Sequence, residues 1–484
     1  MFIIPCSMFD IYNMMKDVLI LMKSELVITF IIFLLLFIKI GKGIKNESLL
    51  SLVQVLLLVN FIAGFFFNKS GNLFGDMFHT SSLIAFQKNI LNLGVYLISL
   101  LCADWLKKTP HLPEFFMLML SALLGMFFMI SSGNLLMFYL SLELATIPLA
   151  AMANFDLDKK RSSEGAMKMI LSSAFSSGIL LFGISLLYGA TGTISFSELP
   201  QQLDGSAFQI LAFVFLFAAF AFKLSIVPFH LWTADVYEGS PIAATSFLSV
   251  ISKGSIAFVF ISFLYNVFQP MHEVWYTMLV ILAIATMVIG NLFALRQQNI
   301  KRFLAFSSIA QVGFILVGIS SYDTADNAAG ITSVIYFILI YTFSNLAAFG
   351  VASVIAEKTG KENIDDYKGL YRTNPFLSWI LTLALFSLAG IPPTAGFFGK
   401  LFLLTAGASK GSYWFITIAA LNMVISLYYY LRVVRAMFMD KNEQPVEKIN
   451  TNPVTKFALI LCAGAIVLVG LLSWIYDYIE SLIK

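Results

Sequence analysis

Long apolar stretches separated by short polar loops constrain this chain more than any other feature of its sequence. Apolar residues make up 59% of its 484 residues and charged residues only 12%, whereas soluble domains carry about 25% charged residues. A helix needs roughly 20 apolar residues to cross a membrane, while the strands of a membrane barrel are short and alternate in polarity. The sequence therefore excludes a soluble enzyme, a disordered chain and a β-barrel, and it predicts a polytopic helical membrane protein.

Fourteen apolar runs, bounded by charged residues, glycine or proline, have the length expected of membrane spans. The predicted fold class is an all-α polytopic membrane protein with about fourteen transmembrane helices. The predicted spans are 24–40, 49–67, 83–106, 113–131, 133–153, 166–189, 208–229, 241–268, 273–295, 302–320, 328–356, 375–405, 411–431 and 455–476.

Lys and Arg are divided unequally between the two sets of loops. The loops after odd-numbered spans hold 20 of these residues, and the opposite side, both termini included, holds 6. Basic residues accumulate in cytoplasmic loops, so we expect the richer side to be cytoplasmic and both termini to lie outside. The remaining basic residues, Lys168, Lys223, Lys253 and Lys400, fall inside apolar runs, and among the acids only Glu143 clearly does.

A charged side chain at the bilayer centre costs roughly 2.5–3.5 kcal/mol on insertion scales. Lys168 lies only a turn or two from the cytoplasmic end of its span, where a side chain can reach the interface, so snorkelling stays open for it. A Glu–Lys pair that only locks two helices together is an alternative for Glu143 and one lysine. Buried amines otherwise load and release protons readily, because burial disfavours their charged form and a nearby carboxylate restores it. Several in series therefore suggest a proton relay.

Two of the predicted spans are interrupted by proline. Pro228 follows Lys223 by five residues, and Pro392 and Pro393 precede Lys400. Proline frees a helix carbonyl, which a membrane tolerates where the helix lines a cavity or a neighbour re-satisfies it. Two broken spans that each carry a lysine are the pattern of repeated transport folds.

The two broken spans are five spans apart, so the second unit is expected to be inverted relative to the first. We predict two inverted five-helix repeats, each containing a broken helix, with Gln311 in AFSSIAQVG at the position that corresponds to Glu143. The predicted units are 1–112 (helices 1–3), 113–268 (first repeat, helices 4–8), 269–440 (second repeat, helices 9–13) and 441–484 (helix 14).

Metal and nucleotide chemistry have little support in the sequence. The three cysteines are too few and too scattered for a zinc site or an iron–sulfur cluster, and the four histidines show no ligand spacing. No GxGxxG motif or Walker loop occurs. We therefore expect any redox reaction to take place on partner proteins. The residues concerned are Cys6, Cys102, Cys462, His79, His111, His230 and His272.

Several stretches resemble the antiporter-like membrane subunits of bacterial respiratory complex I, the NADH-quinone oxidoreductase. Within that family the subunit N group is the most similar, followed more distantly by subunits L and M and the multisubunit cation/proton antiporters. The matching stretches cover most of residues 113–440 and are LSLELATIP around Glu143, EGAMKMILSSAFSSGILLFGISLLYGATGTISF around Lys168, FKLSIVPFHLWTADVYEGSP around Lys223, SVISKGSIAF around Lys253, KRFLAFSSIAQVGF, and AGIPPTAGFFGKLFLL around Lys400.

The resemblance implies a proton-translocating subunit whose relay consists of five residues. Glu143 matches the acidic channel residue of the family, which modulates Lys223, and Lys168 matches the family's further lysine between them. Lys253 matches the central-axis lysine that links two half-channels, and Lys400 matches the exit-side lysine.

The resemblance also implies where the chain works. It places the protein in a bacterial plasma membrane, in contact with subunits M and K, the lateral helix of L and the lipid bilayer. No flavin, iron–sulfur cluster, metal, nicotinamide, quinone or nucleic acid is expected on this chain.

His230, after the first break at the cytoplasmic mouth, is a candidate for proton uptake, with a structural role at the interface as the alternative. A cation/proton antiporter subunit and a structural subunit without a conducting path remain alternative functions.

Overall fold

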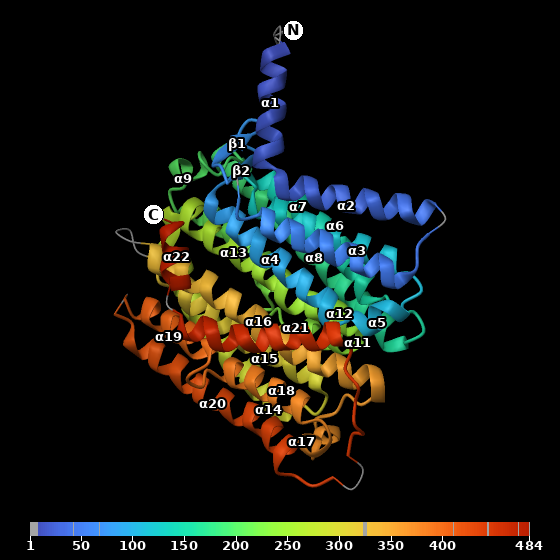
Figure 1. The fold of residues 1–484 in the computed structure, drawn as a ribbon. Coiled ribbons are helices and arrows are strands. Elements are labelled where there is room, and N and C mark those ends of the chain that lie inside the picture. Colours follow the sequence, from blue (N-terminus) through green and yellow to red (C-terminus); the bar gives the residue numbers. More distant parts are fainter. Residues whose placement is uncertain are drawn as a thin grey trace.

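The computed structural model describes residues 8–41, 43–66, 68–322, 327–409, 411–442, 445–472 and 474–483, with side chains from residue 15 onward. Cys6 lies outside these residues. Helices dominate the described chain, and most of them run side by side in one bundle (Figure 1). The prediction of an all-α polytopic membrane protein is confirmed apart from one small feature, a two-stranded antiparallel hairpin formed by β1 (Gly71–Leu73) and β2 (Phe78–Thr80).

The first half of the bundle contains the predicted spans one to eight. Its helices are α1 (Met8–Leu21), α2 (Lys23–Ile40), α3 (Asn46–Ala63), α4 (Ser82–Leu101), α5 (Ala103–Lys108), α6 (Leu112–Ile130), α7 (Leu135–Ala153), α8 (Lys160–Thr191), α9 (Leu199–Gln202), α10 (Ala207–Leu224), α11 (Leu231–Gly239), α12 (Ile242–Ser246), the π-helical η1 (Phe247–Ser252), α13 (Lys253–Ser262) and the π-helical η2 (Phe263–Val267).

The second half contains the remaining spans. Its helices are the 3₁₀ turn η3 (Gln269–Met271), α14 (His272–Arg296), α15 (Ile300–Ile319), α16 (Ala328–Thr359), the 3₁₀ turn η4 (Ile364–Tyr367), α17 (Leu370–Thr373), α18 (Pro375–Ala389), α19 (Ala395–Ala408), α20 (Tyr413–Phe438), α21 (Pro453–Leu471) and α22 (Trp474–Ser481).

Each predicted span coincides with one of these helices or with a series of shorter ones. Within the described residues, twelve helical spans are long and apolar enough to cross a membrane, and α2 qualifies when it is joined to α1, from which it is bent by 86°. The predicted span 375–405 is divided between α18 and α19, which are too short to cross alone. Fourteen spans therefore remain a prediction, as do the four units drawn from them.

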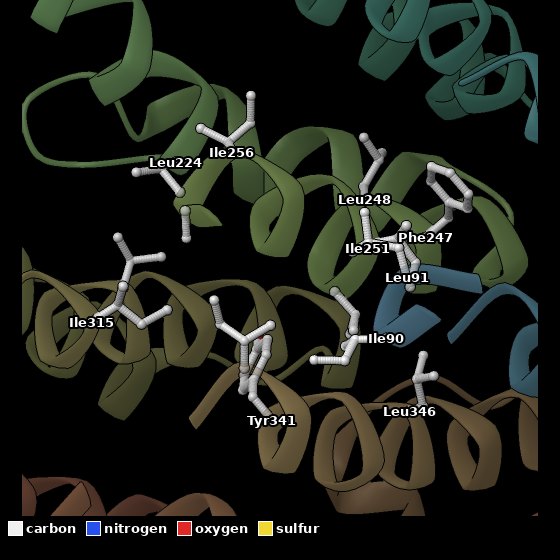
Figure 2. Packing of buried hydrophobic residues seen from close by; sticks show 14 of the residues in the cluster. Ile90, Leu91, Leu224, Phe247, Leu248, Ile251, Ile256, Ile315, Tyr341 and Leu346 are labelled. Atoms are coloured by element: carbon white, nitrogen blue, oxygen red, sulfur yellow. The ribbon is translucent and has the colours of Figure 1, made fainter. Parts of the chain in front are cut away.

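The core lies where α15 and α16 pass through the middle of the bundle, almost wholly enclosed by other helices. Close approach depends on small residues: Gly94 of α4 has no side chain, and Ile251 of η1 occupies the place where a Cβ atom would lie. Figure 2 shows Ile251 beside Leu91 of α4, with Leu346 of α16 on the other side of this contact. Such contacts hold lysine-bearing helices at fixed positions, because close-packed interiors adapt little.

Two buried ion pairs were not expected from the sequence. Lys88, one of the six basic residues counted for the less basic side, is only 3% exposed and lies 2.5 Å from the carboxylate of Glu25, which is 1% exposed. Lys301, assigned to a basic loop, is 2% exposed and lies 3.4 Å from Glu362. Glu143 is therefore not the only acid enclosed by the bundle. Each pair lies near a helix end, where an ionisable residue looks like part of a loop.

Glu362, in the loop after α16, joins three parts of the fold. Its carboxylate binds Lys301 at the start of α15 and Arg161 at the start of α8, the latter at 2.9 Å. Burial alone raises the pKa of Glu362, but the charges of Lys301 and Arg161 and their hydrogen bonds outweigh it and hold the pKa below its ordinary value. The network therefore stabilises the fold above the pKa of the unfolded chain and loses its effect as pH falls through the folded pKa.

Replacing Glu362 by Gln leaves the buried ammonium of Lys301 without its carboxylate. We expect Glu362→Gln to lower the free energy of unfolding at neutral pH by about 3 kcal/mol, the lower end for a broken buried pair. The measurement is thermal unfolding of the protein in detergent. The matched control is Glu47→Gln, since Glu47 is 75% exposed and pairs with Lys107 at 3.5 Å; it should change stability by less than about 1 kcal/mol. Equal effects of the two substitutions would contradict this account.

Candidate functional site

The bundle has two chemically different ends. The hairpin end holds β1 and β2, of which Phe78 in β2 pairs with Ser132, and also the bridge between Asn134 and Ser195. The basic end holds the ion pairs of Arg161 and Lys301 with Glu362. The five predicted relay residues lie on α7, α8, α10, α13 and α19, between these ends or close to the basic one.

Lys223 lies in the last turn of α10, where the helix stops before Pro228. Its ammonium donates a 2.8 Å hydrogen bond to Oγ1 of Thr146, one turn along α7 from Glu143. Oε1 of Glu143 is buried without a hydrogen-bond partner among the described residues, and within that part of the chain no ion pair joins Glu143 to Lys223 within 4.0 Å. The two side chains are thus close enough for their charges to interact, and Oε1 of Glu143 is not fixed by a hydrogen bond to any described residue.

A small cavity adjoins Lys223. It has a volume of about 20 Å³, enough for about one water molecule. We call it the inner cavity. Its walls combine apolar side chains with the hydroxyl groups of Thr146, Ser173, Ser252 and Ser255. A water molecule of this size would have hydroxyl groups of α7, α8 and the η1–α13 helix within the same cavity, which makes the surroundings of Lys223 suitable for proton transfer.

At the break in the seventh predicted span, neighbouring side chains form hydrogen bonds with backbone groups that the interrupted helix leaves free. Ser225 has a left-handed backbone conformation that ends α10. The amide of Val227 donates to Oγ1 of Thr286 at 3.1 Å, and Nε1 of Trp232 donates to the carbonyl of Phe222 at 3.1 Å. Lys223 therefore lies at the carbonyl end of a half-helix, where the helix dipole favours a positive charge.

Lys253 begins α13 directly after the π-helical turn η1 and is 3% exposed. Its ammonium donates a 2.8 Å hydrogen bond to Oγ of Ser308 on α15 and lies 5.6 Å from the centre of the Tyr237 ring. Since α15 belongs to the second predicted repeat, Lys253 connects the two halves through neutral groups.

Lys400, 1% exposed, is held by the carbonyl groups at the other helix break. It donates to the carbonyls of Leu388 at 2.7 Å and Ala389 at 3.3 Å, at the end of α18, and lies 4.6 Å from the Phe314 ring centre. Lys223 and Lys400 therefore both lie at the carbonyl ends of half-helices, as a buried cation requires.

A chain of neutral polar groups lies between Lys253 and Lys400 that the sequence analysis did not identify as functional. Ser307, next to Ser308, pairs with the hydroxyl of Tyr430 at 2.5 Å. Nε2 of Gln311 donates to this hydroxyl at 3.0 Å and to the carbonyl of Leu388 at 2.9 Å, the same carbonyl that binds Lys400. The available signal was the polar content of SSIAQ within an otherwise apolar run.

Lys168 occupies a different environment from the other lysines. Its side chain is 43% exposed and pairs with Glu164 at 2.6 Å and Asp235 at 2.7 Å. Asp235 also binds Arg302 at 2.7 Å, and Arg302 binds Glu238 at 2.8 Å. These groups form an ion-pair cluster near the basic end, and none of the described contacts places Lys168 against Glu143 or Lys223.

His230 precedes α11 and is 6% exposed, with neither ring nitrogen bonded to any described residue. The imidazole is therefore enclosed by the described helices. The described residues include no group of three His, Cys, Asp or Glu side chains arranged to hold a metal ion.

Several local features occur in both halves, and each is separated from its counterpart by the same number of residues. Gly125 packs against Ala145 as Gly290 packs against Ala310, and Asn134 and Asn299 accept hydrogen bonds at the starts of α7 and α15. In this register Ser308 corresponds to Glu143, and Gln311 corresponds to Thr146. The predicted match of Gln311 with Glu143 is therefore wrong by one helical turn. A short stretch of mostly apolar residues does not determine which turn of one helix corresponds to which turn of the other.

Comparisons with known proteins agree with this architecture. The family model described as NADH:quinone oxidoreductase/Mrp antiporter, TM, matches residues 132–426. NADH-quinone oxidoreductase subunit N of Phocaeicola vulgatus is 44% identical over 465 residues, which cover 95% of this chain and 98% of the relative. The subunit N of Azobacteroides pseudotrichonymphae is 48% identical over 422 residues, which cover 86% and 87%.

Solved structures show the same fold. A chain of respiratory complex I from Thermus thermophilus gives a TM-score of 0.79 at 25% identity, covering 93% of this chain and 97% of that one. A chain of the Mrp complex from Dietzia sp. gives 0.79 at 19% identity, covering 95% and 99%. With a family model that spans more than half of the sequence and close relatives along nearly all of it, this chain belongs to the NADH:quinone oxidoreductase/Mrp antiporter family, in the branch of NADH-quinone oxidoreductase N subunits.

Proposed function

We propose that this chain is a proton-translocating membrane-arm subunit of NADH-quinone oxidoreductase. NADH oxidation and quinone reduction take place on other subunits, and this chain uses the released energy to move protons outward. The observation that carries the proposal is the placement of Lys253, an amine enclosed at the contact between the two halves and held, among the described residues, by a hydroxyl group and an aromatic ring. Because no described carboxylate pairs with it, we assign to this amine the binding and release of a proton.

The relay begins at Lys223, whose proton is stabilised when Glu143 approaches and released when it withdraws. Lys253 takes up the proton through the polar surroundings of the inner cavity, to which its neighbours Ser252 and Ser255 contribute. Ser307, Ser308, Tyr430 and Gln311 provide the polar connection from Lys253 to Lys400. Lys400 then releases the proton outward. Lys168 belongs to the relay at its basic end, where its ion pairs join α8 to α11. His230 is a candidate for proton uptake.

The protein is placed in the bacterial plasma membrane with its basic end in the cytoplasm, because basic loops stay on that side. Both termini then lie outside. Its neighbours are the membrane subunits M and K, the lateral helix of L and the lipid bilayer. Flavin, iron–sulfur clusters, NADH and quinone belong to other subunits, and this chain binds none of them and no nucleic acid.

A subunit of a cation/proton antiporter is the second candidate, favoured by the shared fold of the Dietzia Mrp chain. The two functions differ in their driving force. Proton movement that depends on NADH in sealed membranes supports the oxidoreductase, whereas movement driven by an imposed Na⁺ gradient supports the antiporter.

Replacing the central amine tests the proposal. We expect Lys253→Met to assemble and to lower NADH-driven proton export by most of the share that this subunit contributes, because a positioned proton carrier is lost. The measurement is acidification inside inverted membrane vesicles together with NADH oxidation. Lys108→Met is the control, because Lys108 is 63% exposed and its ion pair lies at the surface. Full proton export by an assembled Lys253→Met complex would favour a structural subunit without a conducting path.

The carboxylate next to Lys223 is tested separately. Glu143→Gln keeps the size of the side chain and removes its charge, so the ammonium of Lys223 loses its modulating partner. We expect proton export to fall strongly in Glu143→Gln and to recover in Glu143→Asp, measured as initial rates at a fixed NADH concentration. Equal loss in both variants would show that packing at this position matters more than charge.

A further inference from the structure

A second cavity opens at the hairpin end, on the opposite side of the first half from the ion-pair cluster. Its volume is about 230 Å³, and we call it the outer pocket. Asn72, Asp76 and His79 line its rim, while Met129, Val259 and other apolar side chains form its floor. None of the relay residues proposed above lines it.

The hairpin is fastened over this pocket by backbone hydrogen bonds. The amide of His79 donates to the carbonyl of Ser131 at 2.8 Å, and the amide of Gly133 donates to the carbonyl of Met77 at 2.8 Å. Gly133 has no room for a Cβ atom, which would clash with the Asp76 carbonyl. The hairpin is thus fixed to the turn between α6 and α7, and the polar rim is a built part of the fold.

The rim can accept a proton. Nδ2 of Asn72 donates to Asp76 at 2.8 Å, which leaves the amide oxygen of Asn72 facing Nδ1 of His79 at 2.6 Å. That oxygen is an acceptor, so Nδ1 carries the hydrogen of the neutral ring and Nε2 remains free to take another. Burial lowers the pKa of His79 below its ordinary value and the charge of Lys88 adds to this, while the negative charge of Asp76 opposes it. The ring therefore releases a received proton readily.

The outer pocket and the inner cavity share one wall. Met129 of α6 lines both. On α13, Ile256 lines the inner cavity and Val259 the outer pocket, a separation of only ~4.5 Å along a helix. The side chain of Met129 and about one turn of α13 therefore separate the Lys223 site from a pocket that opens at the hairpin end.

We propose that Met129 is a gate through which the first half releases protons from Lys223 directly to the outer face, with His79 and Asp76 as the receiving groups. This inference rests on the proposed function and adds an outlet that does not pass through Lys400. When the gate opens, an N–H bond of the Lys223 ammonium breaks, water carries the proton, and an N–H bond forms at Nε2 of His79. One positive charge moves outward and no other bond changes.

Methionine suits this position physically. It is unbranched with three rotatable bonds, so it can move aside without displacing a helix. An apolar constriction also blocks water and protons while it stays dry. With the side chain as it stands, the two cavities are separate, and the outlet is closed.

The test compares two methionines of α6 in purified whole complex reconstituted into liposomes. Met129 and Met119 are both buried, at 1% and 0% exposed, but Met119 lines neither cavity. An acid-to-base pH step is imposed across the liposomes and its decay is followed with an entrapped pH dye. We expect Met129→Ala to speed the decay several-fold and to lower the protons exported per NADH, while Met119→Ala decays like the parent complex.

Two further variants keep every outcome decisive. Met129→Gln has nearly the same size and a polar end, so it serves if Met129→Ala does not assemble, and it should leak as well. Adding Lys223→Met to either variant should suppress the leak, because the outlet begins at that amine. Tight liposomes with both Met129 variants, or a leak that persists without Lys223, would overturn the gate.

The gate and the proposed function fail in different ways. If Lys253→Met has lost proton export and the Met129 variants remain tight, the relay stands and the gate is wrong. If Lys253→Met exports protons normally, the proposed function fails whatever the Met129 variants show. A leak in Met129→Ala that depends on Lys223, together with lost export in Lys253→Met, supports both the gate and the relay.

Discussion

The rest of the structure depends on how a positive amine is held inside an apolar bundle. Lys400 is surrounded by carbonyl oxygens and an aromatic ring, and Lys253 by a hydroxyl group and an aromatic ring. Neutral dipoles of this kind stabilise an ammonium group less than a carboxylate does, so the bound proton is not trapped. The ion pairs of Glu25 with Lys88 and Glu362 with Lys301 show the opposite arrangement, in which charge fixes helices together.

The broken helices are what make the neutral arrangement available. An unbroken helix uses its carbonyls internally, whereas the ends of α10 and α18 leave them free at the level of the lysines. The neighbouring helices then take over the remaining donors, as Thr286 does for Val227. Glu143, without a partner on one oxygen, is the exception among these neutral groups and therefore the natural place for a conformational change to act.

The sequence predicted the helical class, the apolar runs that form helices and the enclosed state of Lys253 and Lys400, because these follow from apolar length and depth. It failed for Lys88 and Lys301, since burial near a helix end depends on which helix packs beside it. For Lys168 the sequence left a position at the interface open, and the structure places its side chain in an ion-pair cluster near the start of α8, which begins at Lys160, before the apolar run. The match of Gln311 with Glu143 needed the packing of Gly290 on Ala310 to correct it.

The central claim is that the amines held by neutral groups are present to carry protons. The most direct measurement is the number of protons exported per pair of electrons in a complex in which Lys223, Lys253 and Lys400 are all Met and Glu143 is Gln. The account predicts that this ratio falls by the whole share contributed by this subunit while electrons still reach quinone. An unchanged ratio in the assembled complex would contradict it.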